Sequence, residues 1–295
     1  VLIGNPAAIR QNLNDMDEAT YDVIDPSSND YVDRLVGVMQ RNRSHDVQSD
    51  DKCRGALQNP FTLATMLVEA GICDGMVAGS DLPYGEMVRP ILTYGSKRAG
   101  VSRIAGMHLL TVKDRPLFFA DTALIVDPSA EELAEIAMRA SRVVKRLNIT
   151  PRVAFVSYAN FSKREDTDIA KLRRAYKIVR TVDPELECWR DVQADVALDP
   201  DRFRDVFGGQ LHSKPANILI FPNLQAANAA YRVARVIGDG TAFGPMLLGL
   251  RRPCNVLPRG STEEELMNMM VITAYNAQRR KAEIEDGKKT QIWKG

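Results

Sequence analysis

Short apolar runs alternate with amphipathic segments along most of the chain. Buried strands are predicted in three apolar runs, residues 75–79, 153–157 and 217–221. Helices are predicted where apolar side chains recur at helical spacing, in residues 60–69, 171–182, 224–237 and 264–278. Strands that alternate with helices in this way favour an α/β fold with a mostly parallel sheet.

The strongest helix signal begins at Ser129. Its hydroxyl can cap the helix, and Glu132 three residues later completes a capping box. The apolar positions that follow share one face at helical spacing: Leu133, Ile136, Ala137, Ala140, Val144 and Leu147. The segment therefore predicts an amphipathic helix.

An antiparallel pair of strands is predicted before that helix. Residues 104–112 and 117–120 are strand-like, and residues 113–116 between them fit a tight turn. Such a pair would be an antiparallel addition to an otherwise parallel sheet, which is common in large sheets.

The predicted elements divide into two doubly wound, three-layer α/β subdomains. Residues 127–243 form a self-contained set of strands and helices, so residues 1–126 and 244–295 are expected to form one discontinuous subdomain around them. Residues 1–4 read as a core strand without a preceding turn, and the native polypeptide is therefore expected to extend upstream. The highly charged residues 279–295 are expected to fray as a tail.

Composition excludes several classes of protein. The chain is 45% apolar with a formal net charge of +1, so it is typical of globular proteins and has no basic footprint for nucleic acid. No apolar run approaches the ~20 residues of a membrane span, and no secretory signal is visible. The four cysteines form no CxxC pair and are expected to be free thiols in a reducing cytoplasm. The three histidines lack metal-ligand spacing, and His108 is expected to be a core or interface histidine.

Well-known catalytic motifs are missing from the sequence, which contains no GxGxxG, Walker P-loop, GxSxG or HExxH. Polar side chains instead follow the predicted strands, where open α/β sheets bind their ligands. These candidates are Asp121, Ser157, Asn160, Gln193, Asp195 and Asn223. Each one taken alone is more often a helix cap or turn residue than a ligand.

Five separated blocks carry a resemblance to a known family. They are residues 119–121, 128–137, 193–197, 216–224 and 244–250, the last followed by Pro253. In this order and spacing the chain resembles the phosphate acetyl/butyryltransferase family. The resemblance implies an interdomain cleft that holds coenzyme A, usually in a homodimer. In working members the thiol of coenzyme A attacks acetyl phosphate, which requires a base, a cation for the departing phosphate and a donor for the oxyanion.

The catalytic segment of that family is altered in this chain. Working members read Asn-Asp-Leu-Ser-Arg-Gly, whereas residues 255–260 read Asn-Val-Leu-Pro-Arg-Gly. Val256 and Pro258 therefore stand where the family has a carboxylate and a hydroxyl, and their side chains offer neither donor nor acceptor. Glu265 falls where the catalytic aspartate would be. Thr262 with Glu265 also matches a capping box, which is the favoured interpretation.

The loop after residues 153–157 resembles one branch of the family. Working transferases carry a Ser-Thr-Lys-Gly-Ser type loop there, whereas residues 157–162 read Ser-Tyr-Ala-Asn-Phe-Ser. This loop is similar to that of the C-terminal domain of hybrid NADP-dependent malic enzymes, which is inactive as a transferase and senses acetyl-CoA. The resemblance implies an upstream malic enzyme module in the same chain, with NADP and a divalent metal in that module only. It also implies acetyl-CoA as an effector of this domain, and a homo-oligomer that is a dimer or larger.

Residues that bind an acyl-CoA are expected to include cations, because its phosphates need them. Arg259 is the first candidate because it retains its family position, whereas another phosphate-binding arginine of the family is replaced by Val236. The candidate ligand residues are Arg89, Lys97, Arg98, Asp121, Asn160, Gln193, Asp195, Asn255 and Arg259, with Ser96, Arg251 and Arg252 as neighbours. Two alternatives stay open: an active phosphate acetyltransferase, with Glu265 as base and Arg259 on phosphate, and a dimerisation module without a ligand.

Overall fold

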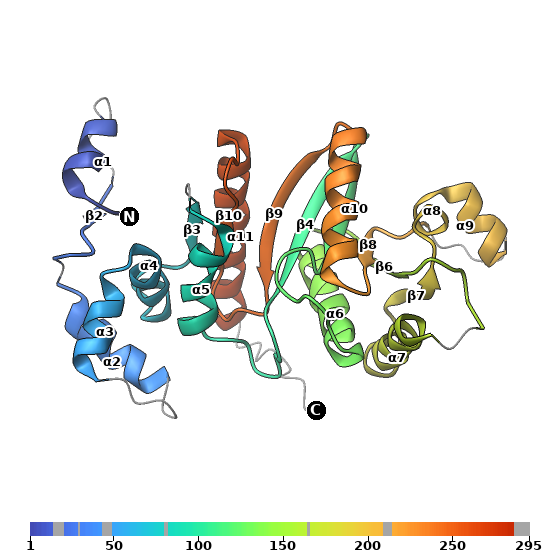
Figure 1. Ribbon diagram of the computed structural model, residues 1–295, viewed down its shortest axis with the longest axis horizontal. Coiled ribbons are helices and arrows are strands. Elements are labelled where there is room, and N and C mark those ends of the chain that lie inside the picture. The colour runs from blue at the N-terminus through green and yellow to red at the C-terminus, as the bar shows by residue number, and fades with distance from the viewer. Residues whose placement is uncertain are drawn as a thin grey trace. The chain divides into compact units, whose positions relative to one another are not determined.

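The chain divides into two units in the computed structural model, which describes residues 1–13, 21–28, 30–42, 49–79, 82–163, 166–208 and 214–285. Unit 1 contains Val1–Arg98 and the chain from Leu250, and unit 2 contains Ala99–Gly249. Figure 1 shows both units and labels most of their helices and strands. Unit 2 is thus inserted into unit 1.

A six-stranded mixed sheet forms the centre of unit 2, in the order β7–β6–β8–β5–β4–β9. The strands are β4 (Ala105–Val112), β5 (Arg115–Ala120), β6 (Arg152–Val156), β7 (Glu187–Val192), β8 (Ile218–Ile220) and β9 (Thr241–Leu248). Neighbouring strands pair in parallel from β7 to β5, whereas β4 is antiparallel to both of its neighbours, β5 and β9. The predicted α/β class is confirmed. The predicted antiparallel pair is also present, with Lys113 and Asp114 at its turn in the left-handed region.

The helices of unit 2 are α6 (Ala130–Arg146), α7 (Thr167–Val182), α8 (Ala194–Leu198), α9 (Pro200–Phe207) and α10 (Leu224–Ile237). All of them except α8 begin at a residue whose side chain caps them. The predicted capping box of α6 is confirmed: Glu132 N donates to Ser129 Oγ at 3.2 Å, and Ser129 N donates to Glu132 Oε2 at 2.9 Å. α7 begins before the predicted residue 171, because Asp166 accepts a hydrogen bond from Ile169 N and caps it there.

The core of unit 2 follows from the alternation of side chains along the sheet. Phe119 and Leu219 are neighbours in β5 and β8, and both enter a cluster with Val196 of α8, Phe203 of α9 and Tyr231 of α10. The alternation is the one expected of strands, whose successive side chains point to opposite faces. Burial of this cluster fixes the sheet against α8, α9 and α10.

Unit 1 contains two parallel two-stranded sheets, β1 (Leu2–Ile3) with β2 (Val23–Ile24) and β3 (Met76–Gly79) with β10 (Cys254–Leu257). Its helices are α1 (Pro6–Asn12), α2 (Val32–Asn42), α3 (Asp50–Leu57), α4 (Pro60–Glu69), α5 (Tyr84–Tyr94) and α11 (Glu263–Glu285). Leu35, Leu63 and Met66 are fully buried where α2, α3 and α4 pack together. No helix in the described ranges has the length and apolar character of a bilayer span.

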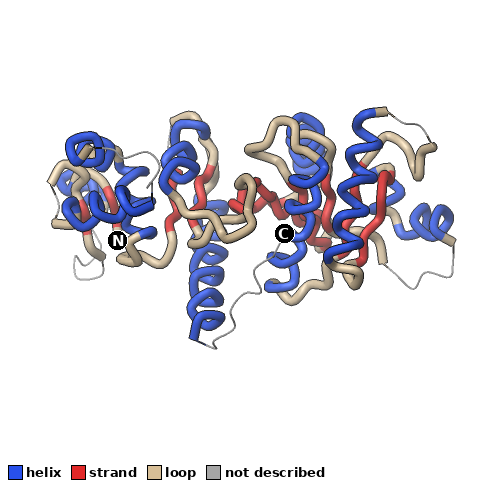
Figure 2. The backbone as a smooth tube through the Cα atoms, turned by 90° about the horizontal axis from the view of Figure 1, so that it is seen from below, coloured by secondary structure: helices blue, strands red, loops and turns tan. Residues whose placement is uncertain are grey.

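Two predictions for the chain ends are wrong. Leu2–Ile3 form the predicted strand, but it is not a core strand, since Val1 and Leu2 are 59% and 38% exposed and β1 pairs only with short β2 in the described chain. Residues 279–285 are helical rather than a frayed tail, because α11 continues to Glu285. Figure 2 shows α11 extending past the short strands of unit 1. The rest of the predicted tail, residues 286–295, lies outside the described residues.

The boundaries of the two units differ from the expected ones at residues 126 and 243. Residues 105–120 and 241–248 pair within the sheet of unit 2, so the units meet in sequence at Arg98–Ala99 and at Gly249–Leu250. The pairing of β9 with β4 and of β8 with β5 joins segments that are far apart in the chain, so the sequence contains no local signal for it. This explains the difference.

Candidate functional site

Residues 255–260, the altered segment, run from β10 to the turn before α11. Asn255 is 3% exposed, and its Nδ2 donates to Thr273 Oγ1 at 2.9 Å, so it ties β10 to α11. Val256 is fully buried in the same strand. Arg259 lies in the turn and is exposed. Of the two candidate ligands in this segment, Arg259 therefore faces solvent and Asn255 is enclosed.

The favoured interpretation of Glu265 as a capping residue is confirmed. Glu265 N donates to Thr262 Oγ1 at 3.2 Å, and Thr262 N donates to Glu265 Oε2 at 2.9 Å. These reciprocal bonds satisfy two backbone donors that the start of a helix leaves unpaired. One carboxylate oxygen of Glu265 is therefore engaged at the beginning of α11.

Asp121 accepts hydrogen bonds from four backbone amides directly after β5. Its Oδ1 accepts from Gly106 N, Ala123 N and Leu124 N, and its Oδ2 accepts from Ile125 N at 2.7 Å. Burial raises the pKa of Asp121 above its usual value, against the lowering effect of these amides. Asp121 is only 3% exposed. Its carboxylate therefore holds the chain after β5 in place and does not face solvent.

Asn160 and Gln193 are brought together at the ends of β6 and β7. Asn160 Nδ2 donates to Gln193 Oε1 at 2.6 Å, and Gln193 N donates to Asn160 Oδ1 at 2.8 Å. Asp195, two residues later, is exposed and pairs with Arg202 at 2.9 Å. The pair Asn160–Gln193 thus joins the loop after β6 to the start of α8.

Of the basic residues before β4, some have exposed side chains and others make hydrogen bonds inside unit 1. Arg89 and Lys97 are exposed, whereas Arg98 Nε donates to Leu250 O at 3.1 Å. Ser96 and Arg251 both donate to Glu69, whose side chain is only 2% exposed. Glu69 was not predicted as a site residue. The signal that could have identified it is a single carboxylate at the end of the otherwise uncharged helix α4.

His108 is a core histidine, as expected. It is 5% exposed, its Nδ1 lies 2.7 Å from Thr122 Oγ1, and its ring stacks on Tyr231 with centroids 4.1 Å apart. Burial is the main reason that the pKa of His108 is lowered from 6.5 to about 3, with smaller contributions from Arg232 and Arg235. The imidazole is therefore neutral at pH 7.

The four cysteines are free thiols, and burial raises the pKa of Cys254 to about 12. Within the described ranges, no three His, Cys, Asp or Glu side chains lie together in a way that could hold a metal ion.

Comparison with known proteins gives these residues a family context. A match to phosphate acetyl/butaryl transferase spans residues 1–274. The chain belongs to the phosphate acetyl/butaryl transferase family.

Relatives of two kinds are found in this family. The chain is 32% identical over 283 residues to a phosphate acetyltransferase of Nitratidesulfovibrio vulgaris, across 95% of this chain and 40% of that protein. It is 30% identical over 288 residues to the NADP-dependent malic enzyme of Escherichia coli, across 94% of this chain and 38% of that protein. A phosphotransacetylase structure from Streptococcus pyogenes aligns with a TM-score of 0.85 and 29% identity, across 94% of this chain and 85% of that one. The chain spans less than half the length of the two curated relatives.

The candidate residues of this family member fall into two groups. Most of them make internal contacts: Lys97 pairs with Leu250 in an isolated antiparallel bridge, and hydrogen bonds or ion pairs engage Arg98, Asp121, Asn160, Gln193, Asp195 and Asn255. Arg89 and Arg259, both in unit 1, are exposed and make no hydrogen bond or ion pair with another described residue. These two guanidinium groups remain available for an anionic ligand.

Proposed function

We propose that this chain is a non-catalytic regulatory domain of a hybrid NADP-dependent malic enzyme that binds acetyl-CoA as an effector and mediates oligomerisation. NADP and a divalent metal would belong to the malic module upstream. Regulation of this kind requires unequal affinity of acetyl-CoA for two conformations, because equal affinity shifts no equilibrium. The similarity to the malic enzyme of Escherichia coli supports the fusion.

The observation that carries the proposal is that residues 255–260 have apolar side chains where the family has a carboxylate and a hydroxyl. Val256 is fully buried and apolar, and Pro258 has no side-chain donor or acceptor. Glu265, which falls where the family has its catalytic aspartate, engages its Oε2 with the backbone of Thr262. Residues 255–260 thus retain a cation for phosphate, but none of their side chains carries a hydroxyl or a carboxylate that could activate a thiol.

Two measurements test the proposal. The chain mixed with acetyl phosphate and coenzyme A should form no thioester above the uncatalysed rate, measured by its ultraviolet absorbance. Calorimetry with acetyl-CoA should show saturable binding, and Arg259→Gln should weaken it roughly tenfold, because a hydrogen bond between charged groups contributes about 1.5–3 kcal/mol. Arg174→Gln, at an exposed position paired with Glu131, is the matched control and should bind as the parent does.

An active phosphate acetyltransferase is the second candidate, and the similarity to the enzyme of Nitratidesulfovibrio vulgaris favours it. In that case Glu265 would act as the base and Arg259 would bind phosphate. Catalysed thioester formation that Glu265→Gln abolishes would establish this function and refute the regulatory one. If the chain shows no turnover and does not bind acetyl-CoA, both functions are refuted and the dimerisation module is favoured.

A further inference from the structure

The outer face of α11 is apolar in the first half of the helix. Met267, Met270 and Val271 are 59%, 49% and 64% exposed, and Ala274 is exposed as well. These residues stand at positions i, i+3, i+4 and i+7, so they form one continuous stripe along the helix. We call Met267, Met270, Val271 and Ala274 the outer stripe of α11.

The other side of α11 packs into unit 1. Met269, Thr273 and Ala277 are buried at a spacing of four residues, and Asn255 of β10 donates to Thr273 at 2.9 Å. Through this side the helix contacts β3 and β10. The core of unit 1 therefore uses one face of α11 and leaves the outer stripe exposed.

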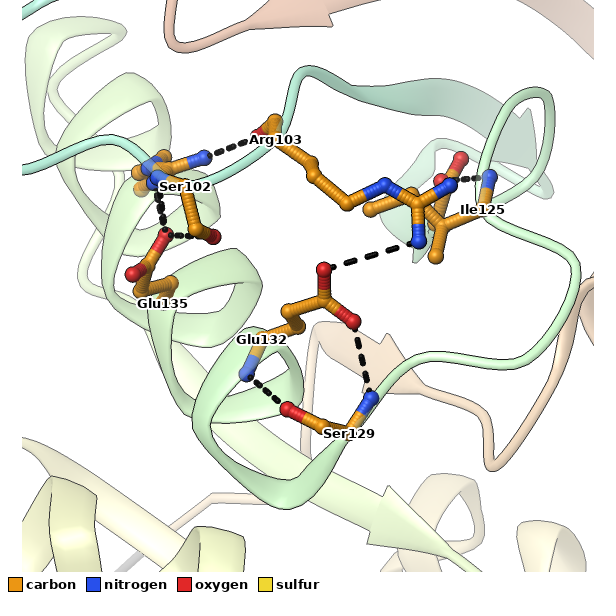
Figure 3. A network of polar contacts seen from close by, with 8 residues as sticks. Ser102, Arg103, Ile125, Ser129, Glu132 and Glu135 are labelled. Carbon is orange, nitrogen blue, oxygen red and sulfur yellow. Dashed lines mark hydrogen bonds and ion pairs between the residues drawn. The ribbon is translucent and has the colours of Figure 1, made fainter.

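α6 shows how the chain builds a helix that faces water. It begins at a capping box, as α11 does, and Figure 3 shows Glu132 and Glu135 held by polar contacts with Ser129 and residues 102–103. The exposed residues of α6 are all charged: Glu131, Arg142 and Lys145. A helix with apolar side chains on both faces is normally covered on both. The outer stripe of α11 therefore indicates a contact surface.

Opposite charges stand at the two ends of the outer stripe. Glu263 precedes it and Lys281 follows it, and both residues are exposed. They are about five helical turns, or about 27 Å, apart, so they lie on the same side of the helix as the stripe. Lys281 also pairs with Asp74 at 2.7 Å, and its side chain is still 59% exposed. The stripe thus runs from a negative end to a positive end.

We propose that a second copy of this chain covers the outer stripe, with the two α11 helices antiparallel about a two-fold axis near Ile272. Glu263 of each copy then lies opposite Lys281 of the other, whereas a parallel pair would bring like charges together. Met270 lies opposite Ala274, which sets a long flexible side chain against a small one. The inference rests on the oligomerisation part of the proposed function and not on acetyl-CoA.

Two charge variants test the antiparallel pairing by sedimentation velocity at low salt. Glu263→Lys brings lysines together at both ends of the pair, and Lys281→Glu brings glutamates together, so each should weaken self-association roughly tenfold. An equal mixture of the two variants should restore it, because each contact of the mixed pair joins opposite charges. Loss of the Asp74 pair in Lys281→Glu cannot produce this recovery, since the mixture lacks that pair too. No recovery would overturn the proposal.

Met270→Glu tests the apolar part of the surface. A charge buried there without a partner should weaken self-association at least about a hundredfold. Leu92→Glu in α5 is the matched control, because Leu92 is 45% exposed and lies outside α11, and it should associate as the parent does. Unchanged association of Met270→Glu would overturn this inference and leave oligomerisation to another surface. A parent that is monomeric at every concentration would overturn both, whereas calorimetry with acetyl-CoA reports on the ligand separately.

Cysteine cross-linking with a short bismaleimide tests the direction of the helices, with Cys73 and Cys188 replaced by serine. Val271→Cys lies near the two-fold axis and should cross-link between copies, because packed helix axes are about 8–10 Å apart. Glu263→Cys should not, because its two copies would be about 27 Å apart. Cross-linking at residue 263 but not at residue 271 would refute the antiparallel pair.

Discussion

Acidification from pH 7 to pH 5 should destabilise unit 2 through His108. The imidazole of this β4 residue is buried in contact with Thr122 and Tyr231, and burial lowers its pKa from 6.5 to about 3. The unfolded chain therefore takes up a proton as the pH falls below 6.5, whereas the folded chain does not until about pH 3. The free energy of unfolding must decrease through this window, because the unfolded state binds more protons.

The pKa difference sets the size of the effect. A change from 6.5 to about 3 corresponds to about 5 kcal/mol over the whole window, since each pH unit contributes about 1.4 kcal/mol. Between pH 7 and pH 5 the free energy of unfolding should fall by about 2 kcal/mol. The fall is smaller than two full pH units would give, because a free imidazole is only partly protonated near pH 6.5. An effect of this size is a large fraction of the stability of a domain.

Urea unfolding at both pH values measures this effect, with the fluorescence of Trp189 in β7 as the probe of unit 2 after Trp293, the second tryptophan of the chain, is replaced by phenylalanine. In His108→Gln the loss of stability between pH 7 and pH 5 should be smaller than in the parent by about 2 kcal/mol. Thr122→Ser is the matched control, because it keeps the hydroxyl partner and the buried ring, and it should retain the full pH dependence. Equal pH dependence in the parent and His108→Gln would refute the assignment.

Three other substitutions test the fold. Phe118→Ala removes a fully buried ring and should lower the free energy of urea unfolding by about 3–5 kcal/mol. Asp121→Ala leaves four backbone amides without their acceptor and should lower it by about 3 kcal/mol or more; a loss below about 1 kcal/mol would contradict this role. Thr262→Ala should destabilise the first turn of α11 by about 1 kcal/mol, seen as faster amide exchange at Glu265, while amides of α6 are unchanged.

Local elements were predictable from the sequence where short-range signals agree. The limits of α4 and α10 match the predicted 60–69 and 224–237, and the Ser129 capping box is present. The short helices α8 and α9 were not predicted, since they offer too few turns for a periodic pattern. The position of β8 between β6 and β5 depends on pairing of distant segments and has no local signal.

The candidate site was predictable in residue type but not in side-chain direction. Asp121, Asn160 and Gln193 follow strands as expected, yet each forms hydrogen bonds within unit 2. The sequence shows that Asp121 follows a strand, but whether backbone amides surround its carboxylate depends on the tertiary structure. The engagement of Ser96 and Arg251 by Glu69 depends on three separate segments of unit 1, so it could not be predicted from their neighbours in the sequence.

The insertion of unit 2 into unit 1 imposes an order on synthesis by the ribosome. β3 emerges early, but β10, its partner strand, is made only after all of unit 2. The nascent chain thus carries β3 without that partner while unit 2, which is continuous in sequence, is completed and able to fold. The β3–β10 sheet of unit 1 can therefore form only after unit 2 has been synthesised, and translation of Cys254–Leu257 is the step that allows β3 to pair.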